Sequence, residues 1–172
     1  MQPTEEDRQV FVDYGATMLV VQAFEWTLKR LAVLYSDTQA NVSMEGAWKV
    51  VEETLQMPVG PLVEQLKKRG RVPENLLGEL REAGRHRNYL AHEFLLVYWI
   101  KKLHNRAAPS EEMAFLQKRR SCFQQLQAFL QQLVDTQSEA IESESSNYEE
   151  VRKIAEEIIP EDEFWEAHPD EP

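Results

Sequence analysis

Apolar residues recur at steps of three, four or seven along most of this chain, and this spacing is typical of helices that bury one side. No segment alternates apolar and polar residues as a half-buried strand does, and no internal repeat is present. The pattern therefore predicts an all-α fold, a helical bundle. Two stretches show it best: Val10, Tyr14, Met18, Val21, Leu28, Leu31 and Tyr35, and then Met113, Leu116, Phe123, Leu126, Leu130 and Leu133.

Start and stop signals divide this pattern into separate helices. Thr4 and Asp7 have the spacing of a capping box for the first helix. Asn41 or Ser43 opens the second. The predicted helices cover residues 4–36, 41–57, 62–69, 74–103 and 109–136.

The end of the chain differs in composition from the rest. Residues 137–146 are polar, acidic and rich in serine, which indicates a frayed helix end or a linker. Ser146 and Glu149 then have capping-box spacing, and they open one more helix that Pro160 stops. We therefore expect two parts, a helical bundle over residues 1–136 and an acidic C-terminal helix and tail over residues 137–172.

The net charge of −11 is distributed unevenly. From Asp135 onward the chain has 14 acidic and 2 basic residues, whereas residues 67–120 carry a net charge of +7. A basic middle favours RNA binding, and the acidic end does not. The acidic tail can fold onto the basic surface and compete with RNA, bind a partner protein, or remain a solvated end.

Composition excludes several kinds of site. Cys122 is the single cysteine, so neither an intrachain disulfide nor a cysteine-based zinc site can form, and a buried packing thiol is expected. His, Asp and Glu show no metal-ligand spacing, so we expect no metal and no cofactor. The chain opens without the features of a secretory signal, and its most apolar stretch, residues 94–100, is too short to span a bilayer. The expectation is a soluble cytoplasmic protein without a membrane segment.

One arginine interrupts the apolar side of the predicted helix over residues 74–103. That side consists of Leu76, Leu80, Ala83, Leu90, Phe94 and Tyr98, and Arg87 falls in its middle on an ideal wheel. A buried charge without a partner is very costly, so the guanidinium must meet a carboxylate, carbonyl groups, a crevice or a ligand anion. A separate polar stripe along the same helix consists of Arg81, Arg85, Asn88 and His92.

The spacing of Arg87 and His92 is weak evidence by itself, because Arg81 and His86 have the same spacing. On spacing alone, Arg87 is interpreted as a structural ion-pair former and His92 as an ordinary residue of the polar face. His86 and His104 are interpreted as surface residues.

The neighbouring residues favour a more specific interpretation. Residues 87–92, Arg-Asn-Tyr-Leu-Ala-His, resemble the R-N-x-x-x-H signature of the HEPN superfamily, with Ala91 before the histidine and the aromatic Phe94 after it. The resemblance covers roughly residues 10–135, and it implies a helical bundle that forms a homodimer whose two motifs line a shared cleft. Many members are metal-independent endoribonucleases that act as toxins in toxin–antitoxin pairs or in phage defence.

The resemblance also implies roles for the motif residues in cleaving RNA through attack of its 2′-hydroxyl on the adjacent phosphate. His92 would transfer protons, Arg87 would clamp the phosphate, and Asn88 would orient the imidazole or hold the substrate. Arg87 and His92 are about 140° apart on an ideal helix. Either the arginine reaches around the helix, or the cleft wraps the helix and the partner subunit completes it.

Basic residues near the motif are candidates for holding the RNA backbone, although a solvated surface explains such a cluster as well. The RNA-binding candidates are Lys67, Lys68, Arg69, Arg81 and Arg85. Further residues of the same charge are Lys101, Lys102, Arg106, Lys118, Arg119 and Arg120.

Phe94 departs from a pattern found in some toxins of this family. In them, a tyrosine two residues after the histidine accepts nucleotides from an antitoxin enzyme. Phe94 has no hydroxyl to modify, so inhibition by this route would need another hydroxyl, such as that of Tyr89.

The sequence is compatible with three functions. The leading hypothesis is a dimeric, metal-independent endoribonuclease that acts on RNA, with an antitoxin protein as a possible partner. The second is a catalytically silent helical module of the same fold that binds a partner protein or a nucleotide. A hydrolase or transferase of another kind is the third, and the sequence gives it little support.

Overall fold

The computed structural model describes residues 2–35, 44–69 and 72–142, which form six α-helices and no strand. The helices are α1 (Glu5–Leu34), α2 (Met44–Gln56), α3 (Val59–Lys68), α4 (Glu74–His92), α5 (Phe94–Leu103) and α6 (Pro109–Glu142). The predicted all-α bundle is confirmed. The capping box is confirmed as well, because Asp7 donates its backbone N–H to Thr4 Oγ1 at 3.2 Å and its carboxylate accepts the Thr4 N–H at 2.6 Å.

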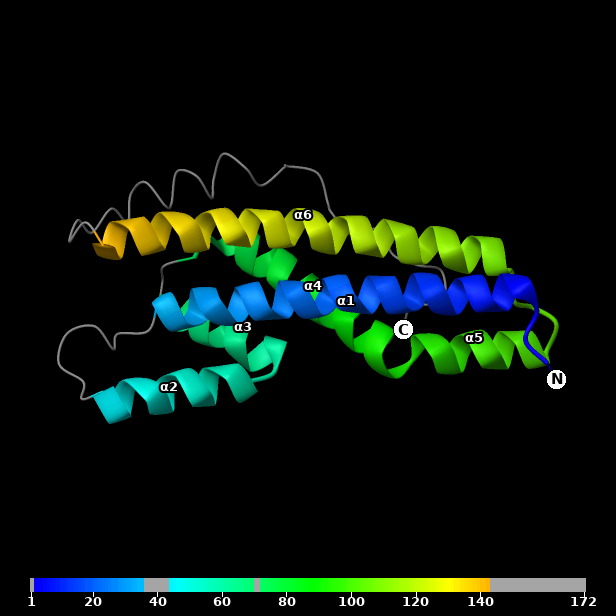
Figure 1. Cartoon of the computed structure of the whole chain (residues 1–172), viewed down its shortest axis with the longest axis horizontal. Helices are drawn as coiled ribbons and strands as arrows, with labels where there is room; N and C mark the ends of the chain where they lie inside the picture. The colour runs from blue at the N-terminus through cyan, green and yellow to red at the C-terminus, as the bar shows by residue number, and fades with distance from the viewer. Residues whose placement is uncertain (1, 36–43, 70–71, 143–172) are drawn as a thin grey trace.

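The two long helices, α1 and α6, lie side by side and run in the same direction (Figure 1). Thr17 Oγ1 of α1 donates to the Leu116 carbonyl of α6 at 3.3 Å, and Arg30 Nη1 donates to Gln131 Oε1 at 3.3 Å further along. Helix α4 passes obliquely behind α1, whereas α2 and α5 lie toward opposite ends of the molecule (Figure 1). This arrangement makes α1 the helix around which the others pack.

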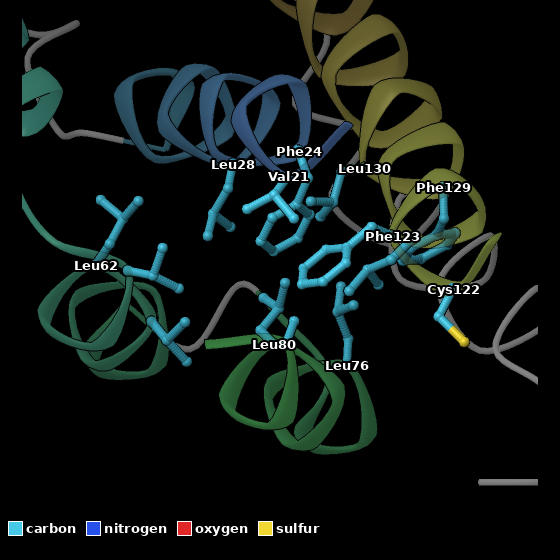
Figure 2. Packing of buried hydrophobic residues seen from close by; sticks show 14 of the residues in the cluster. Val21, Phe24, Leu28, Leu62, Leu76, Leu80, Cys122, Phe123, Phe129 and Leu130 are labelled. Carbon is cyan, nitrogen blue, oxygen red and sulfur yellow. The ribbon is translucent and has the colours of Figure 1, made fainter. Parts of the chain in front are cut away.

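The core lies where α1, α3, α4 and α6 meet (Figure 2). Phe24 of α1 and Phe123 of α6 are fully buried, and their ring centroids are 5.3 Å apart. Leu62 and Leu80 complete the same layer from α3 and α4. Cys122 is buried at 8% exposure, as expected for a packing thiol.

The prediction of one continuous helix over residues 74–103 was wrong, because the helix breaks at Glu93. Glu93 has a φ of −120° and a ψ of −39°, and α4 ends on one side of it while α5 begins on the other. Since α4 crosses α1 obliquely, a straight continuation would carry Phe94 and Tyr98 away from α1. The break turns α5 back, so that both side chains are almost fully buried.

Two other helix boundaries differ from the prediction. Helix α3 begins at Val59 rather than at residue 62, because Pro58 serves as its N-cap and Pro61 is tolerated in the first turn, where backbone N–H groups lack partners. Helix α6 continues to Glu142, into the segment interpreted as a frayed end or linker. The predicted helix start at Asn41 or Ser43, and the helix and tail predicted after residue 142, lie outside the described residues.

Candidate active site

The predicted motif occupies the end of α4, where this helix passes α1. Leu80, Ala83 and Leu90 are buried on the inner side of α4, and they fix the direction of its outer side. Asn88 and His92 lie on that outer side and are exposed. The motif end of the predicted polar stripe therefore faces solvent.

Arg87 forms an ion pair with Glu25 of α1. Arg87 Nε donates to Glu25 Oε1, and the two side chains are 30% and 18% exposed, respectively. A guanidinium at this position was predicted to need a partner. In the structure that partner is the Glu25 carboxylate, 62 positions away along the chain. The pair lies at the boundary between α1 and α4 and is still partly open to solvent.

The same guanidinium reaches toward the outer side of α4. Arg87 Nη1 donates to Asn88 Oδ1 at 3.3 Å. Asn88 precedes His92 by one helical turn, so the two side chains project from the same side of the helix. The Arg87 guanidinium thus lies between the Glu25 carboxylate of α1 and the Asn88 amide of α4.

Aromatic side chains anchor the backbone that carries His92. Tyr14 donates its hydroxyl to the Leu90 carbonyl at 3.1 Å, and its ring stacks on that of Phe94 with centroids 5.6 Å apart. Burial raises the pKa of Tyr14, so its hydroxyl stays protonated and able to donate at neutral pH. Phe115 of α6 lies 5.9 Å from Phe94 and 6.0 Å from Tyr89. The junction of α4 and α5 is therefore held from both α1 and α6.

Tyr89 and Phe94 both belong to this aromatic cluster. Phe94 is 1% exposed and Tyr89 is 5% exposed. The side chain of Tyr89 therefore offers almost no surface to another protein in this fold.

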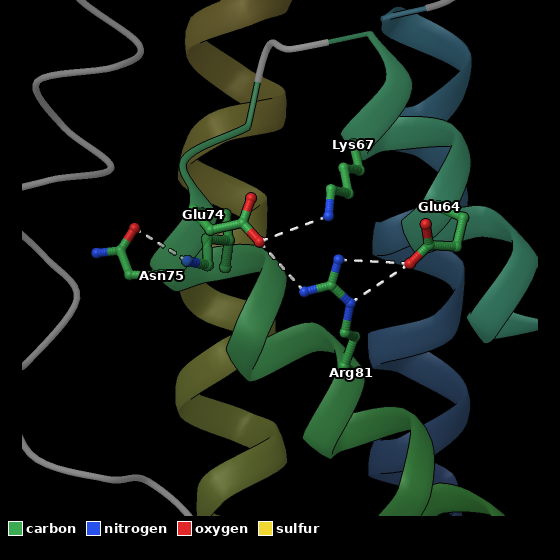
Figure 3. A network of polar contacts seen from close by, with 6 residues as sticks. Glu64, Lys67, Glu74, Asn75 and Arg81 are labelled. Atoms are coloured by element: carbon green, nitrogen blue, oxygen red, sulfur yellow. Dashed lines mark hydrogen bonds and ion pairs between the residues drawn. The ribbon is translucent and has the colours of Figure 1, made fainter.

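Two of the five RNA-binding candidates, Lys67 and Arg81, lie together between α3 and α4, where they form ion pairs with carboxylates (Figure 3). Arg81 Nη2 lies 3.4 Å from Glu64, and Arg81 Nη1 lies 3.4 Å from Glu74. Lys67 Nζ lies 3.8 Å from the same Glu74. This network favours the solvated-surface alternative for Lys67 and Arg81.

The other three candidates, Lys68, Arg69 and Arg85, have different surroundings. Arg69 Nη1 donates to the Tyr35 carbonyl, which ties the end of α3 to the end of α1. Arg85 is 76% exposed and pairs with Glu82 at 2.8 Å. Lys68 is exposed on α3. Only Arg85 lies on α4 within one turn of the motif.

Lys101 and Lys102, which were expected to extend the basic surface, hold α5 in place instead. Lys101 Nζ lies 3.1 Å from Glu112, which is 5% exposed. Lys102 and the Tyr98 hydroxyl both donate to the fully buried Asp7 at the start of α1. These two hydrogen bonds, with that of Lys102 the stronger cause, hold the pKa of Asp7 well below its usual range.

Arg119 and His86 were expected on the surface, and both are buried, at 1% and 7% exposure. The Arg119 guanidinium lies over the Phe115 ring at 5.0 Å from its centroid. His86 follows Ala83 by three residues and precedes Leu90 by four, so it shares their buried side. The surface predictions failed because they considered charge and ignored the helical register of these positions.

Glu25 is the site residue that the sequence did not reveal. A signal was present, because Glu25 is the only charged residue between Asp13 and Lys29. An acidic residue inside such an apolar stretch needs a cationic partner when its helix packs. Which cation would meet it depends on how α1 and α4 cross.

Within the described part of the chain, no group of three or more His, Cys, Asp or Glu side chains could hold a metal ion. None of the helices described is both long enough and apolar enough to cross a membrane.

Comparison with known proteins gives no match for this chain among protein-family models, curated proteins or solved structures. Its function is therefore inferred from its own residues and their geometry.

Proposed function

We propose that this protein is a metal-independent endoribonuclease of HEPN type, with Arg87, Asn88 and His92 in an active site at a homodimer cleft. The observation that carries this proposal is the 3.3 Å contact between Arg87 Nη1 and Asn88 Oδ1. It brings the guanidinium toward the exposed side of α4 from which His92 projects. An arginine, an amide and an imidazole are thus available together at one helix end.

In the proposed reaction, the 2′-oxygen of RNA forms a bond to the adjacent phosphorus, and the bond from phosphorus to the 5′-oxygen breaks. The products are a 2′,3′-cyclic phosphate and a free 5′-hydroxyl. A base must take the proton of the 2′-hydroxyl, and an acid must protonate the leaving 5′-oxygen. In a homodimer, the two copies of His92 supply an imidazole for each step.

While Arg87 pairs with Glu25, some of its N–H groups are still available to donate to a phosphate. A guanidinium has five N–H donors. The Nε donor goes to Glu25 and one Nη1 donor goes to Asn88, which leaves the rest for phosphate oxygens. Glu25 then fixes the plane of the guanidinium, and the 30% exposure of Arg87 gives the phosphate access.

In this proposal the enzyme cleaves RNA in the cytoplasm as a toxin or as an effector of phage defence, and an antitoxin protein restrains it. Arg85 and Lys68 are the RNA-binding candidates best placed to contact the backbone, because both are exposed. Arg69, Arg81 and Lys67 would contribute less, because Arg69 donates to the Tyr35 carbonyl and the side chains of Arg81 and Lys67 are 34% and 48% exposed, against 76% for Arg85.

The test is to incubate the purified full chain with single-stranded RNA in EDTA, beside the variants Arg87→Ala and His92→Ala. We expect cleavage that survives chelation and leaves a cyclic phosphate, and we expect each variant to lose about 100-fold or more of it. His104→Ala is a matched control, because this exposed histidine lies after α5, away from the motif. Cleavage that persists in both motif variants would contradict the assignment.

A second candidate function is a catalytically silent module of the same fold that binds a partner protein or a nucleotide. The Glu25 pair favours it, because a guanidinium held by a carboxylate is also what a purely structural arginine shows. RNA that stays intact under every condition would support this module and overturn the nuclease. Growth arrest on expression, relieved by His92→Ala, is an independent check that favours the nuclease.

A further inference from the structure

Helix α1 carries an exposed apolar row on the side opposite its fully buried Val21 and Leu28. Val12, Leu19 and Trp26 follow one another at steps of seven, with exposures of 62%, 68% and 56%. A surface helix usually carries polar residues on this side. We define the outer face of α1 as this row and the uncharged residues around it, Gly15, Ala16, Gln22 and Ala23.

The outer face differs from the side of α1 that contacts the motif. Tyr14 donates to the Leu90 carbonyl, and Glu25 pairs with Arg87. On an ideal helix, Tyr14 and Glu25 lie roughly 120° to 140° around α1 from the middle of the apolar row. An element that covers the outer face therefore lies away from the motif on α4.

The Trp26 end of the outer face is positively charged. Lys29 Nζ donates to the Leu55 carbonyl at 2.7 Å, and Arg30 Nη1 donates to the amide oxygen of Gln131 at 3.3 Å. Both of these acceptors are neutral, so neither contact cancels the charge of its cation. This end therefore favours an occupant that brings acidic residues.

A second copy of the same face does not meet this requirement. In an antiparallel pairing about Leu19, the exposed Arg30 of each copy would face the exposed Arg8 of the other. Like charges placed opposite each other oppose such a pairing. The occupant must bring both an apolar side and negative charge.

Residues 143–172, which we call the C-terminal segment, have this composition. They include 11 acidic and 2 basic residues. The sequence predicts a helix that Ser146 opens and Pro160 stops, with Glu149 and Glu150 near its start. One side of that predicted helix is apolar and consists of Tyr148, Val151, Ile154, Ala155 and Ile158.

The C-terminal segment also begins close enough to the positive end of the outer face. Helix α6 lies beside α1, and its Gln131 is level with Arg30 (Figure 1). Helix α6 ends at Glu142, 11 residues later, which is about 16 Å further along its axis. Six extended residue steps from Glu142 span up to about 20 Å. The chain can therefore turn back and bring Tyr148 to the level of Arg30.

We infer that the C-terminal segment folds back and packs its predicted helix on the outer face of α1, antiparallel to α1. With Tyr148 beside Arg30, Ile158 lies beside Leu19, because the two helices advance by the same rise per residue. The apolar side of the predicted helix then removes Trp26 and Leu19 from water, and its acidic start lies beside the two cations.

This inference goes beyond the proposed function and does not depend on it. The C-terminal segment then extends the bundle by one helix and ties the end of α6 to α1. It lies away from Asn88 and His92, so the acidic residues do not compete with RNA for the motif. The outer face is the binding site, and the basic surface of residues 67–120 is not.

The first test is hydrogen–deuterium exchange of the full chain, followed by mass spectrometry. We expect the amides of residues 148–158 to be protected, and we expect Leu19→Asp to make them exchange about 10-fold faster or more, because a carboxylate would be buried under the apolar side of the segment. Leu103→Asp is the matched control, since Leu103 is 67% exposed on α5. Unprotected amides in the wild type, protection that survives Leu19→Asp, or protection lost in the control would each overturn the inference.

The second test fixes the register and does not depend on the Asp variant. In a Cys122→Ser background, the pair Leu19→Cys and Ile158→Cys should form a disulfide within one chain on oxidation. The pair Leu103→Cys and Ile158→Cys is the control and should not form one. No link in the first pair, or equal linking in the control, would overturn the antiparallel contact.

The same oxidation experiment distinguishes a second copy from the C-terminal segment. A disulfide that joins two chains through Leu19→Cys, with sedimentation of the wild type as a dimer that Leu19→Asp dissociates, would assign the outer face to a second copy and overturn the inference. A link within a single chain supports it. None of these measurements uses RNA, so the nuclease proposal can fail or stand separately.

Discussion

Arg87 Nε donates to the carboxylate of Glu25, and this ion pair joins the motif end of α4 to α1. Both side chains are partly exposed, at 30% and 18%, so water and salt screen their attraction. The pair therefore adds little to the stability of the fold, and its main effect is to fix the position of the guanidinium.

A double-mutant cycle measures how strongly the two residues are coupled. We expect Glu25→Gln and Arg87→Met to show a coupling energy of roughly 1 kcal/mol in the free energy of unfolding, because partly exposed pairs seldom exceed that value. The measurement is urea unfolding of the wild type, both single variants and the double variant. Strictly additive effects would show that the pair does not couple the two helices.

Arg87→Lys separates charge from geometry. Lysine keeps the positive charge beside Glu25, but a single ammonium cannot replace the planar guanidinium that contacts Glu25 and Asn88 and still faces a phosphate. For the proposed nuclease we expect RNA cleavage to fall about 100-fold, with the free energy of unfolding within about 1 kcal/mol of the wild type. Cleavage at the wild-type rate would rule out the role of phosphate clamp.

The helices and most of the core could be predicted from the sequence, because a buried helix side needs an apolar residue at nearly every turn. The break at Glu93 could not, since the apolar side continues through Leu90, Phe94 and Tyr98 without interruption. That break depends on the crossing of α4 over α1, which is a tertiary property. For the same reason, the need of Arg87 for a partner was predictable and the identity of Glu25 was not.

Asp7→Asn tests the polar contacts that hold α5 on α1. The fully buried Asp7 accepts from Lys102 and Tyr98, and its pKa is held well below the usual 3.8, chiefly by the hydrogen bond from Lys102. At neutral pH we expect the variant to be less stable by about 3 kcal/mol, the usual effect of removing one partner of a buried ion pair.

The pH dependence follows from the direction of this shift. A pKa that is lowered in the folded state contributes stability that is fully present above the unfolded pKa of about 4 and is lost as the pH falls toward the folded pKa. The difference between wild type and Asp7→Asn should therefore shrink below about pH 4. Asp135→Asn, on the exposed side of α6, is the control and should show no such change. A stability difference that does not vary with pH would contradict the assignment.

Tyr14→Phe removes the hydroxyl that donates to the Leu90 carbonyl at 3.1 Å and leaves the ring that stacks on Phe94. We expect a loss of about 1 kcal/mol in stability, which is typical of one hydrogen bond. Because this bond anchors the backbone of the motif, the amides of Asn88 and His92 should also exchange with deuterium faster than in the wild type. Unchanged exchange at these amides would show that the aromatic stacking alone holds the motif.

Gly78→Ala should stabilise the protein without altering its site. Gly78 lies inside α4, and a Cβ placed there would have no heavy atom within 4 Å. Alanine in a helix interior is favoured over glycine by about 1 kcal/mol, so the free energy of unfolding should rise by roughly that amount. Gly84→Ala is the comparison, because its Cβ would lie 3.4 Å from Val59 Cγ1. We therefore expect a smaller rise in the free energy of unfolding for Gly84→Ala than for Gly78→Ala. If Gly78→Ala lowers the stability, that side of α4 is not open. If it raises the stability, it gives a background in which Arg87 and His92 variants can be compared while folded.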